Sequence, residues 1–225
     1  MRNGTGEEAL RFPDALRADR ELFLKEIAPW LQSGRLGPEF PDRIDRYAAL
    51  LHNRIPTLAV VGKRDRDSIY TRHILDSLNP MTLFEQPPDL FLDIGSGGGL
   101  PGIPLALAWP EARAVLLESR DRKAAFLERT LRDLDLRAAR VVCERLEEHV
   151  RKCGPVYDVL FVRAVADPAR LIEESGACCL PGARWVYFLG AGIDRDSLKR
   201  ALAVTGREGV EAAGSFGGRL FTGRV

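Results

Sequence analysis

The sequence feature that most constrains this chain is a short apolar run that leads directly into a glycine-rich loop. Residues 90–94 are Leu-Phe-Leu-Asp-Ile, and residues 95–102 are Gly-Ser-Gly-Gly-Gly-Leu-Pro-Gly. The apolar run is typical of a strand that is covered on both faces of a parallel sheet. Glycines allow positive φ and a close approach of a ligand to the backbone, and Pro101 suits a first helical turn. The stretch therefore predicts a strand, a cofactor-binding loop and a helix N-terminus.

The spacing of the glycines narrows the choice of cofactor. A dinucleotide fingerprint counted from Gly95 requires glycine at position 100, where this chain has Leu100. The pattern present from Asp93 to Gly99 is acid-x-Gly-x-Gly-x-Gly, which is typical of S-adenosylmethionine (SAM) enzymes. We therefore expect Asp93, Gly95, Gly97 and Gly99 to bind SAM. A tight structural turn is the alternative, and a dehydrogenase ranks last.

A carboxylate at the end of the next apolar run supports an adenosine cofactor. Residues 114–117 are Ala-Val-Leu-Leu, and Glu118 follows them. An acid at the end of the second strand can accept both hydroxyls of a ribose. We expect Glu118 to bind the cofactor, and the alternative is a solvated acid at a strand end.

The periodicity of the chain predicts an α/β fold. Residues 1–85 have helical spacing, with helices expected near 16–31, 42–51 and 66–78. Pro29, Gly34 and Pro80 mark expected helix ends. From residue 86 to 225, strands alternate with helices, which predicts a parallel sheet covered on both faces. Further strands are expected at 114–117, 140–143, 157–162 and 184–189, helices at 121–134, 146–150, 168–179 and 194–204, a turn at 181–182, and a closing antiparallel pair at 210–212 and 219–222.

Composition sets the broad class of protein. The chain has 225 residues and a net charge of +1, which allows one large core with an appendage and argues against a uniformly basic surface. The four cysteines include no Cys-x-x-Cys pair, so we expect reduced thiols and no metal site. No apolar run reaches the length of a membrane span, and the first residues lack a signal-peptide core. These features predict a cytoplasmic protein that does not enter a membrane.

Four motifs, in their order and spacing, resemble those of the bacterial 16S ribosomal RNA guanine-N7 methyltransferase G family, also called glucose-inhibited division protein B. They are Arg-His-Ile-Leu-Asp-Ser-Leu at 72–78, the glycine stretch at 93–102, Arg-Leu-Glu-Glu at 145–148 and Arg-Ala-Val-Ala at 163–166. The resemblance extends from about residue 46 to residue 192. It implies a Rossmann-like class I SAM-dependent methyltransferase sheet with an N-terminal helical extension.

The resemblance also implies a reaction and a set of site residues. The reaction is methyl transfer from SAM to guanine N7 in small-subunit ribosomal RNA, either free or in a pre-ribosomal particle. Carried over by position, Gly95 and Leu100 contact SAM, Leu146 and Glu147 lie beside the adenine, and Arg163 lines the site as a further cofactor-binding residue. Core packing is the alternative for Leu146. A cation such as Arg163, directly after a central apolar strand, also suits a functional role without the resemblance.

Binding of RNA requires contacts to phosphates. We expect Arg72 and His73 to contact the substrate, and helix packing is the alternative for His73. Other candidate cations are Arg54, Lys63, Arg64 and Arg66, together with the arginines of the 121–134 helix, although Asp65 and Asp67 dilute the first group and a solvated surface is an equal alternative. No catalytic base is expected, since N7 carries a free lone pair. We expect a monomer.

Two positions depart from the family pattern. The family usually has Asn-Leu-Thr before the Arg-His motif, where this chain has Thr57-Leu58-Ala59, and it tends to have Lys-Gly after the fifth strand, where this chain has Gly190-Ala191. Both departures lie in the substrate-facing half. They leave open a SAM enzyme that acts on a small molecule or a protein, and an RNA-binding relative without catalytic activity.

Overall fold

The structure is a computed structural model that describes residues 14–58, 63–163, 168–189, 209–213 and 219–224. Its centre is a seven-stranded sheet of order β3-β2-β1-β4-β5-β7-β6. The first five strands in this order are parallel, and β7 pairs antiparallel with both β5 and β6. The strands are β1 (Leu90–Ile94), β2 (Arg113–Leu117), β3 (Ala139–Val142), β4 (Tyr157–Arg163), β5 (Cys179–Phe188), β6 (Gly209–Ala213) and β7 (Arg219–Arg224). The sheet and the closing antiparallel pair confirm the predicted α/β class.

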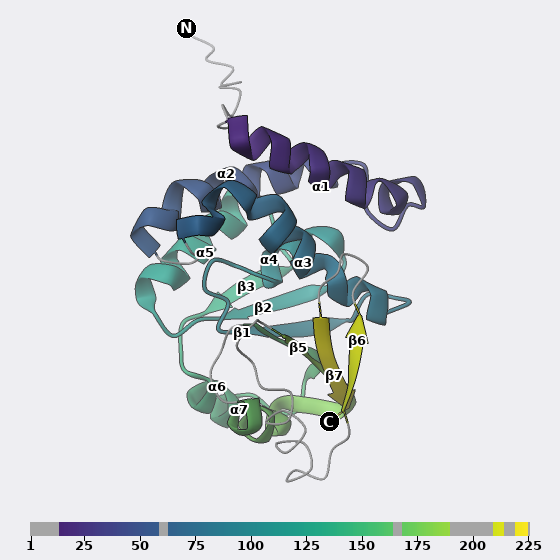
Figure 1. Cartoon of the computed structure of the whole chain (residues 1–225). Coiled ribbons are helices and arrows are strands. Elements are labelled where there is room, and N and C mark those ends of the chain that lie inside the picture. The colour runs from purple at the N-terminus through teal and green to yellow at the C-terminus, as the bar shows by residue number, and fades with distance from the viewer. Residues whose placement is uncertain (1–13, 59–62, 164–167, 190–208, 214–218, 225) are drawn as a thin grey trace, which may run out of the picture.

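Helices cover both faces of the sheet, as Figure 1 shows. One face carries α4 (Gly102–Ala108) and α5 (Asp121–Asp133), with the N-terminal helices packed over them, and the other face carries α6 (Leu146–Lys152) and α7 (Pro168–Ser175). The buried apolar residues of the N-terminal helices form one continuous cluster with those of the first face. A second cluster fills the space under α6 and α7. The N-terminal region therefore shares a core with the sheet, and its separation at residue 85 into a domain of its own stays a prediction.

The first two helices are longer than the sequence pattern predicts. The helix α1 (Asp14–Gln32) continues past Pro29. Pro29 lies in its last turn, and its carbonyl still accepts a bond from the Ser33 amide at 3.0 Å. The chain turns instead at Gly34, whose φ is 71°. The helix α2 (Phe40–Leu58) also extends beyond its expected end. None of the helices in the described ranges is long and apolar enough to cross a membrane.

The third predicted helix, 66–78, is replaced by three short segments, and a fourth follows it. They are a 3-10 helix η1 (Lys63–Ser68), a π-helix η2 (Tyr70–Ile74), α3 (Leu75–Leu78) and a second 3-10 helix η3 (Asn79–Leu83). Asp19 of α1 accepts bonds from the amides of Tyr70, at 2.7 Å, and Thr71, at 3.3 Å. This buried carboxylate fixes the start of the π-helix, a contact that local periodicity does not reveal. Pro80 occupies the first turn of η3, so the chain stays coiled where a break was expected.

The C-terminal half differs from prediction in two places. The expected turn at 181–182 lies within β5, where the register with β4 shifts between Tyr157 and Val159 and absorbs the extra residues. The helix expected up to residue 179 ends as α7 at Ser175, followed by a 3-10 turn, η4 (Gly176–Cys178). The helix expected at 194–204 lies outside the described residues. All four cysteines are free thiols.

Candidate cofactor site

The glycine loop takes the conformation that its sequence predicts. Gly95, Gly97 and Gly99 have φ values of 72°, 57° and 93°, a region that L-residues rarely adopt. The amides of Gly95 and Ser96 both donate to the Leu117 carbonyl, at 2.8 and 3.0 Å. These bonds tie the loop to the end of β2. The loop is thus held at the carboxyl ends of β1 and β2, where open parallel sheets bind their ligands.

Asp93 lies underneath the loop and is 1% exposed. Its Oδ2 atom accepts a bond from the Gly102 amide at 3.1 Å, whereas its Oδ1 atom is buried and has no hydrogen-bond partner among the described residues. Burial raises the pKa of Asp93 to about 7, although the hydrogen bond from the Gly102 amide opposes the shift. A large share of the Asp93 side chains is therefore protonated near neutral pH and able to donate a bond from the loop floor.

The raised pKa of Asp93 predicts a pH-dependent stability. The folded state keeps this proton while the unfolded chain loses it near pH 4, so the free energy of unfolding falls as the pH rises from about 4 to 7. Urea denaturation at pH 5 and pH 8 measures this change. Between these two pH values, the free energy of unfolding should fall by about 2 to 3 kcal/mol more in the wild type than in Asp93→Asn, which cannot titrate. Equal falls in the two proteins would contradict a buried, protonated Asp93.

Glu118 is attached to the loop rather than solvated, with 6% of its surface exposed. Its Oε2 atom accepts a bond from the Gly97 amide and its Oε1 atom from the Arg120 amide, both at 2.9 Å. Each carboxylate oxygen keeps a second acceptor position, because a carboxylate offers about four lone-pair sites. Glu118 therefore shapes the loop and retains capacity for two hydroxyl donors.

A cavity of about 340 Å³ opens beside this loop, between the ends of β1 and β2 and the helices α6 and α7. Three predicted residues line it: Gly95, Leu146 and Glu147. Leu146 is buried in the cluster of the second face, so core packing and cavity lining are combined in one side chain. The Glu147 carboxylate pairs with Arg170 of α7 at 2.7 Å. The residues predicted beside an adenine are thus grouped in one cavity.

Part of the cavity wall was missed by the sequence interpretation. Glu144 lines the cavity, and its two oxygens contact His149 Nδ1, at 2.8 Å, and Lys152. These two partners lower the pKa of the Glu144 carboxyl. His149 is buried and also contacts the Tyr157 hydroxyl at 2.6 Å. The position of Glu144, two residues after the end of β3, was the available signal, whereas nothing in the sequence indicated Arg170 of α7.

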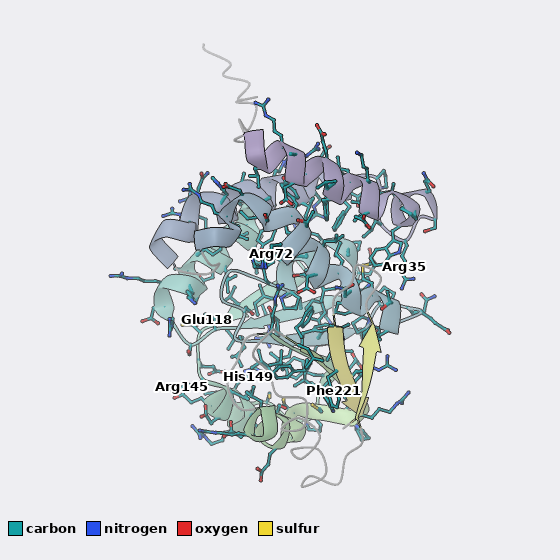
Figure 2. The ribbon with its side chains drawn as sticks, in the orientation of Figure 1. Arg35, Arg72, Glu118, Arg145, His149 and Phe221 are labelled. Carbon is teal, nitrogen blue, oxygen red and sulfur yellow. The ribbon has the colours of Figure 1, made fainter. Side chains whose placement is uncertain are left out.

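Arg72, His73 and Arg163 form a second group outside this cavity. Arg163, at the end of β4, pairs with Asp76 at 3.0 Å and with the Ser77 hydroxyl at 2.9 Å. Its guanidinium also lies 3.3 Å from His73 Nδ1. Arg72 is exposed beside them, and Figure 2 shows it above Glu118, with Arg145 and His149 below. Leu100 instead packs into the core of the first face, so its side chain does not line the cavity.

Comparisons with known proteins agree on one family. The family model described as rRNA small subunit methyltransferase G matches residues 42–208. The ribosomal RNA small subunit methyltransferase G of Roseiflexus castenholzii is 37% identical over 172 residues, which are 76% of this chain and 74% of that protein. The protein of the same name from Xanthomonas oryzae pv. oryzae is 38% identical over 160 residues, 71% of this chain and 74% of that protein.

Solved structures with a similar fold include a methyltransferase and a cofactor-bound protein. The O-methyltransferase from Bacillus cereus in complex with SAH has a TM-score of 0.57 at 14% identity and covers 92% of this chain and 100% of its own. Cofactor-bound Rv0187 from MTB has a TM-score of 0.56 at 18% identity and covers 96% of this chain and 98% of its own. At these identities the likeness shows a shared class I methyltransferase fold.

Proposed function

We propose that this chain, which belongs to the rRNA small subunit methyltransferase G family, methylates N7 of a guanine in small-subunit ribosomal RNA. Family membership makes the chain a SAM-dependent methyltransferase of this RNA. The guanine and its N7 atom are the part that goes beyond membership. They follow from the family resemblance of the motifs at 72–78, 93–102, 145–148 and 163–166.

The observation that carries the proposal is the positive-φ loop beside the cavity, with Glu118 attached to it. A Cβ added at Gly97 would meet only the Gly95 carbonyl, at 3.7 Å, so this side of the loop has room for a ligand. The second lone pairs of the Glu118 carboxylate, whose Oε2 atom already accepts the Gly97 amide, offer polar contacts beside it. We assign SAM binding to Asp93, Gly95, Gly97, Gly99, Leu100, Glu118, Leu146 and Glu147, with Leu100 acting through its backbone.

In the proposed reaction, the main task of the protein is to orient the methyl group of SAM and guanine N7 toward each other. SAM supplies an electrophilic methyl group, and guanine N7 has an exposed lone pair that needs no deprotonation. We therefore assign no catalytic base. The loop and Glu118 hold the cofactor side, and the segment that carries Arg72 and His73 faces the RNA side. Orientation of two reactants in this way can lower a barrier by about 7 to 11 kcal/mol in favourable cases.

The proposed partner is small-subunit RNA, either free or within a partly assembled particle. The net charge of +1 favours a particle that presents the base, because a weakly charged protein gains little from phosphate attraction alone. A monomeric, cytoplasmic enzyme is part of the same proposal. Of the two departures from the family pattern, the first includes Ala59 and the second is the pair Gly190-Ala191. These three residues lie outside the described residues.

The test is labelling of small subunits from cells that lack this protein. With radiolabelled SAM, the wild-type protein should transfer label to the RNA, and mass spectrometry of the digested RNA should identify 7-methylguanine at one position. Label found at another atom of the base would contradict the N7 assignment. Label found only in a small-molecule or protein fraction would favour the diverged methyltransferase, and salt-sensitive RNA binding without SAM binding would favour the inactive relative.

A further inference from the structure

We propose that Arg163 and Asp76 form an ion pair that positions the substrate-side segment 72–77, and that Arg163 acts through this segment instead of contacting SAM. Residues 72–77 are hereafter the latch segment. The inference rests on the proposed function, because it assigns the latch segment to the RNA side of that same site. It makes Arg163 a positioning residue, and it adds Asp76 and Ser77 to the residues on which the reaction depends.

The contacts of the Arg163 guanidinium support this role. Nη2 lies 3.0 Å from Asp76 Oδ2 and 3.3 Å from His73 Nδ1. Nη1 donates to the Ser77 hydroxyl at 2.9 Å and to the His73 carbonyl at 3.1 Å. Among the described residues, every hydrogen bond and ion pair of this guanidinium ends on the latch segment. The side chain is only 17% exposed, so little of it remains for another partner.

The latch segment contains the junction between the π-helix η2 and α3. The helical hydrogen-bond pattern changes at this junction, so an arginine that binds it at several points can stabilise it. The His73 carbonyl lies at this junction and accepts the Ser77 hydroxyl at 2.6 Å in addition to Arg163. Asp76 is further held by the Asn79 side chain at 3.1 Å. A π-helical turn inside a helix is a frequent feature of functional sites. A planar guanidinium with several donors can bind such a junction at several points, which an ammonium cannot do.

The other end of Arg163 is fixed to the part of the sheet that carries the glycine loop. Arg163 follows Val162, which pairs with Ile94 of β1, and Ile94 lines the cavity directly before Gly95. The ring of Phe188 lies below the guanidinium, with Cζ 5.6 Å from the ring centre. The ion pair thus joins the latch segment to the strand beside the cofactor loop. A shift of the latch segment would move Arg72 and His73 relative to that loop.

The experiment compares Arg163→Gln, Asp76→Asn and the double variant with the wild type, with SAM affinity and turnover measured separately. We expect each single variant to bind SAM within about threefold of the wild type, because neither side chain lines the cavity. Turnover at saturating SAM and RNA should fall about tenfold to 100-fold, the range in which misplacement of reactants is costly. The double variant should lose no more than the worse single variant, because both act through one contact. Arg163→Lys should restore only part of the turnover.

A SAM affinity about tenfold weaker in Arg163→Gln but unchanged in Asp76→Asn would overturn the inference, because it would make Arg163 a cofactor contact. The inference would also be overturned if the fold-loss of turnover in the double variant equalled the product of the fold-losses in the two single variants. Ser77→Ala removes one acceptor of the Arg163 guanidinium and leaves both charges of the ion pair in place. It replaces Arg163→Gln or Asp76→Asn in this experiment if either of them fails to fold. Its turnover should fall by about threefold to tenfold, with SAM affinity unchanged.

Hydrogen exchange separates this inference from the proposed function. In the single variants, amides at 72–78 should exchange faster than in the wild type, whereas amides at 93–99 should keep their rates. This result would support the role of the ion pair in positioning the latch segment, even if the wild type failed to methylate RNA. Such a failure would count against the proposed function alone. Unchanged exchange rates at 72–78 in the single variants would overturn the inference, whether or not the variants methylate RNA.

Discussion

Replacement of Gly95 with aspartate is expected to abolish SAM binding and, with it, methylation of small-subunit RNA. Gly95 has a φ of 72°, lines the cavity and donates its amide to the Leu117 carbonyl. A side chain at this position would place a carboxylate in the space proposed for the cofactor, beside Glu118 and Glu147. We expect a loss of about 3 kcal/mol or more in binding, roughly 100-fold in affinity, measured by titration calorimetry with SAM.

Gly34→Asp is the matched control for this variant. Gly34 has nearly the same φ, 71°, and a Cβ added there meets nothing within 4 Å. The backbone strain of about 1 to 2 kcal/mol is therefore the same in both variants, but Gly34 lies in the turn after α1, away from the loop. If Gly34→Asp lost SAM binding as completely as Gly95→Asp, general destabilisation would explain both results. Unchanged binding by Gly95→Asp would exclude the assigned loop.

The second large effect is expected on folding, from Gly102→Ala. A Cβ at this position would lie 2.3 Å from Leu116 Cδ2 and 2.5 Å from Asp93 Oδ2. The backbone of α4 therefore approaches β1 and β2 too closely for any side chain. Relief of the clash must move a core residue or break the bond between the Gly102 amide and Asp93. We expect the free energy of unfolding to fall by about 2 to 4 kcal/mol, the range for overpacked cores and broken buried bonds.

Urea denaturation measures this change, with Gly154→Ala as the comparison. A Cβ at Gly154 meets nothing within 4 Å, and its φ is not in the left-handed region. That variant should keep its stability within about 0.5 kcal/mol. Equal stability of the two variants would mean that α4 does not approach β1 as closely as the structure shows.

The sequence predicted the elements whose signal is local. The glycine loop followed from residue spacing, and the parallel strands followed from short apolar runs such as 90–94 and 114–117, because a strand buried on both faces must be apolar at nearly every position. The antiparallel closing pair, β6 and β7, is also confirmed. Gly34 was rightly expected near the end of the first helix, since that turn requires a positive φ.

The features that could not be predicted depend on contacts between distant residues. Asp19 supports the π-helix from 51 positions away, so a regular helix was the reasonable expectation for that stretch. The pairing of Arg163 with Asp76 likewise joins two motifs that the sequence had assigned to different sides of the site. A solvated acid at a strand end was the alternative for Glu118, and its burial depends on the folded loop, in which the Gly97 amide donates to it. Tertiary contacts, not local preferences, decide each of these cases.

The contact between Tyr47 and the loop adds a direct link from the N-terminal helices to the cofactor side. The Tyr47 hydroxyl donates to the Gly98 carbonyl at 2.9 Å, and the side chain is fully buried. The N-terminal helices therefore reach the site at two points: at the loop through Tyr47 and at the end of β4 through the latch segment. This arrangement explains why they share a core with the sheet and do not form a loosely attached appendage.

The most direct measurement is a crystal structure of the protein with S-adenosylhomocysteine, the product that remains after methyl transfer. The account predicts that the product lies against Gly95 and Gly97, that its ribose hydroxyls are within hydrogen-bond distance of Glu118, and that its adenine occupies the cavity beside Leu146. Product bound elsewhere, or bound with its ribose away from Glu118, would contradict the central claim that this loop and this carboxylate hold the methyl donor.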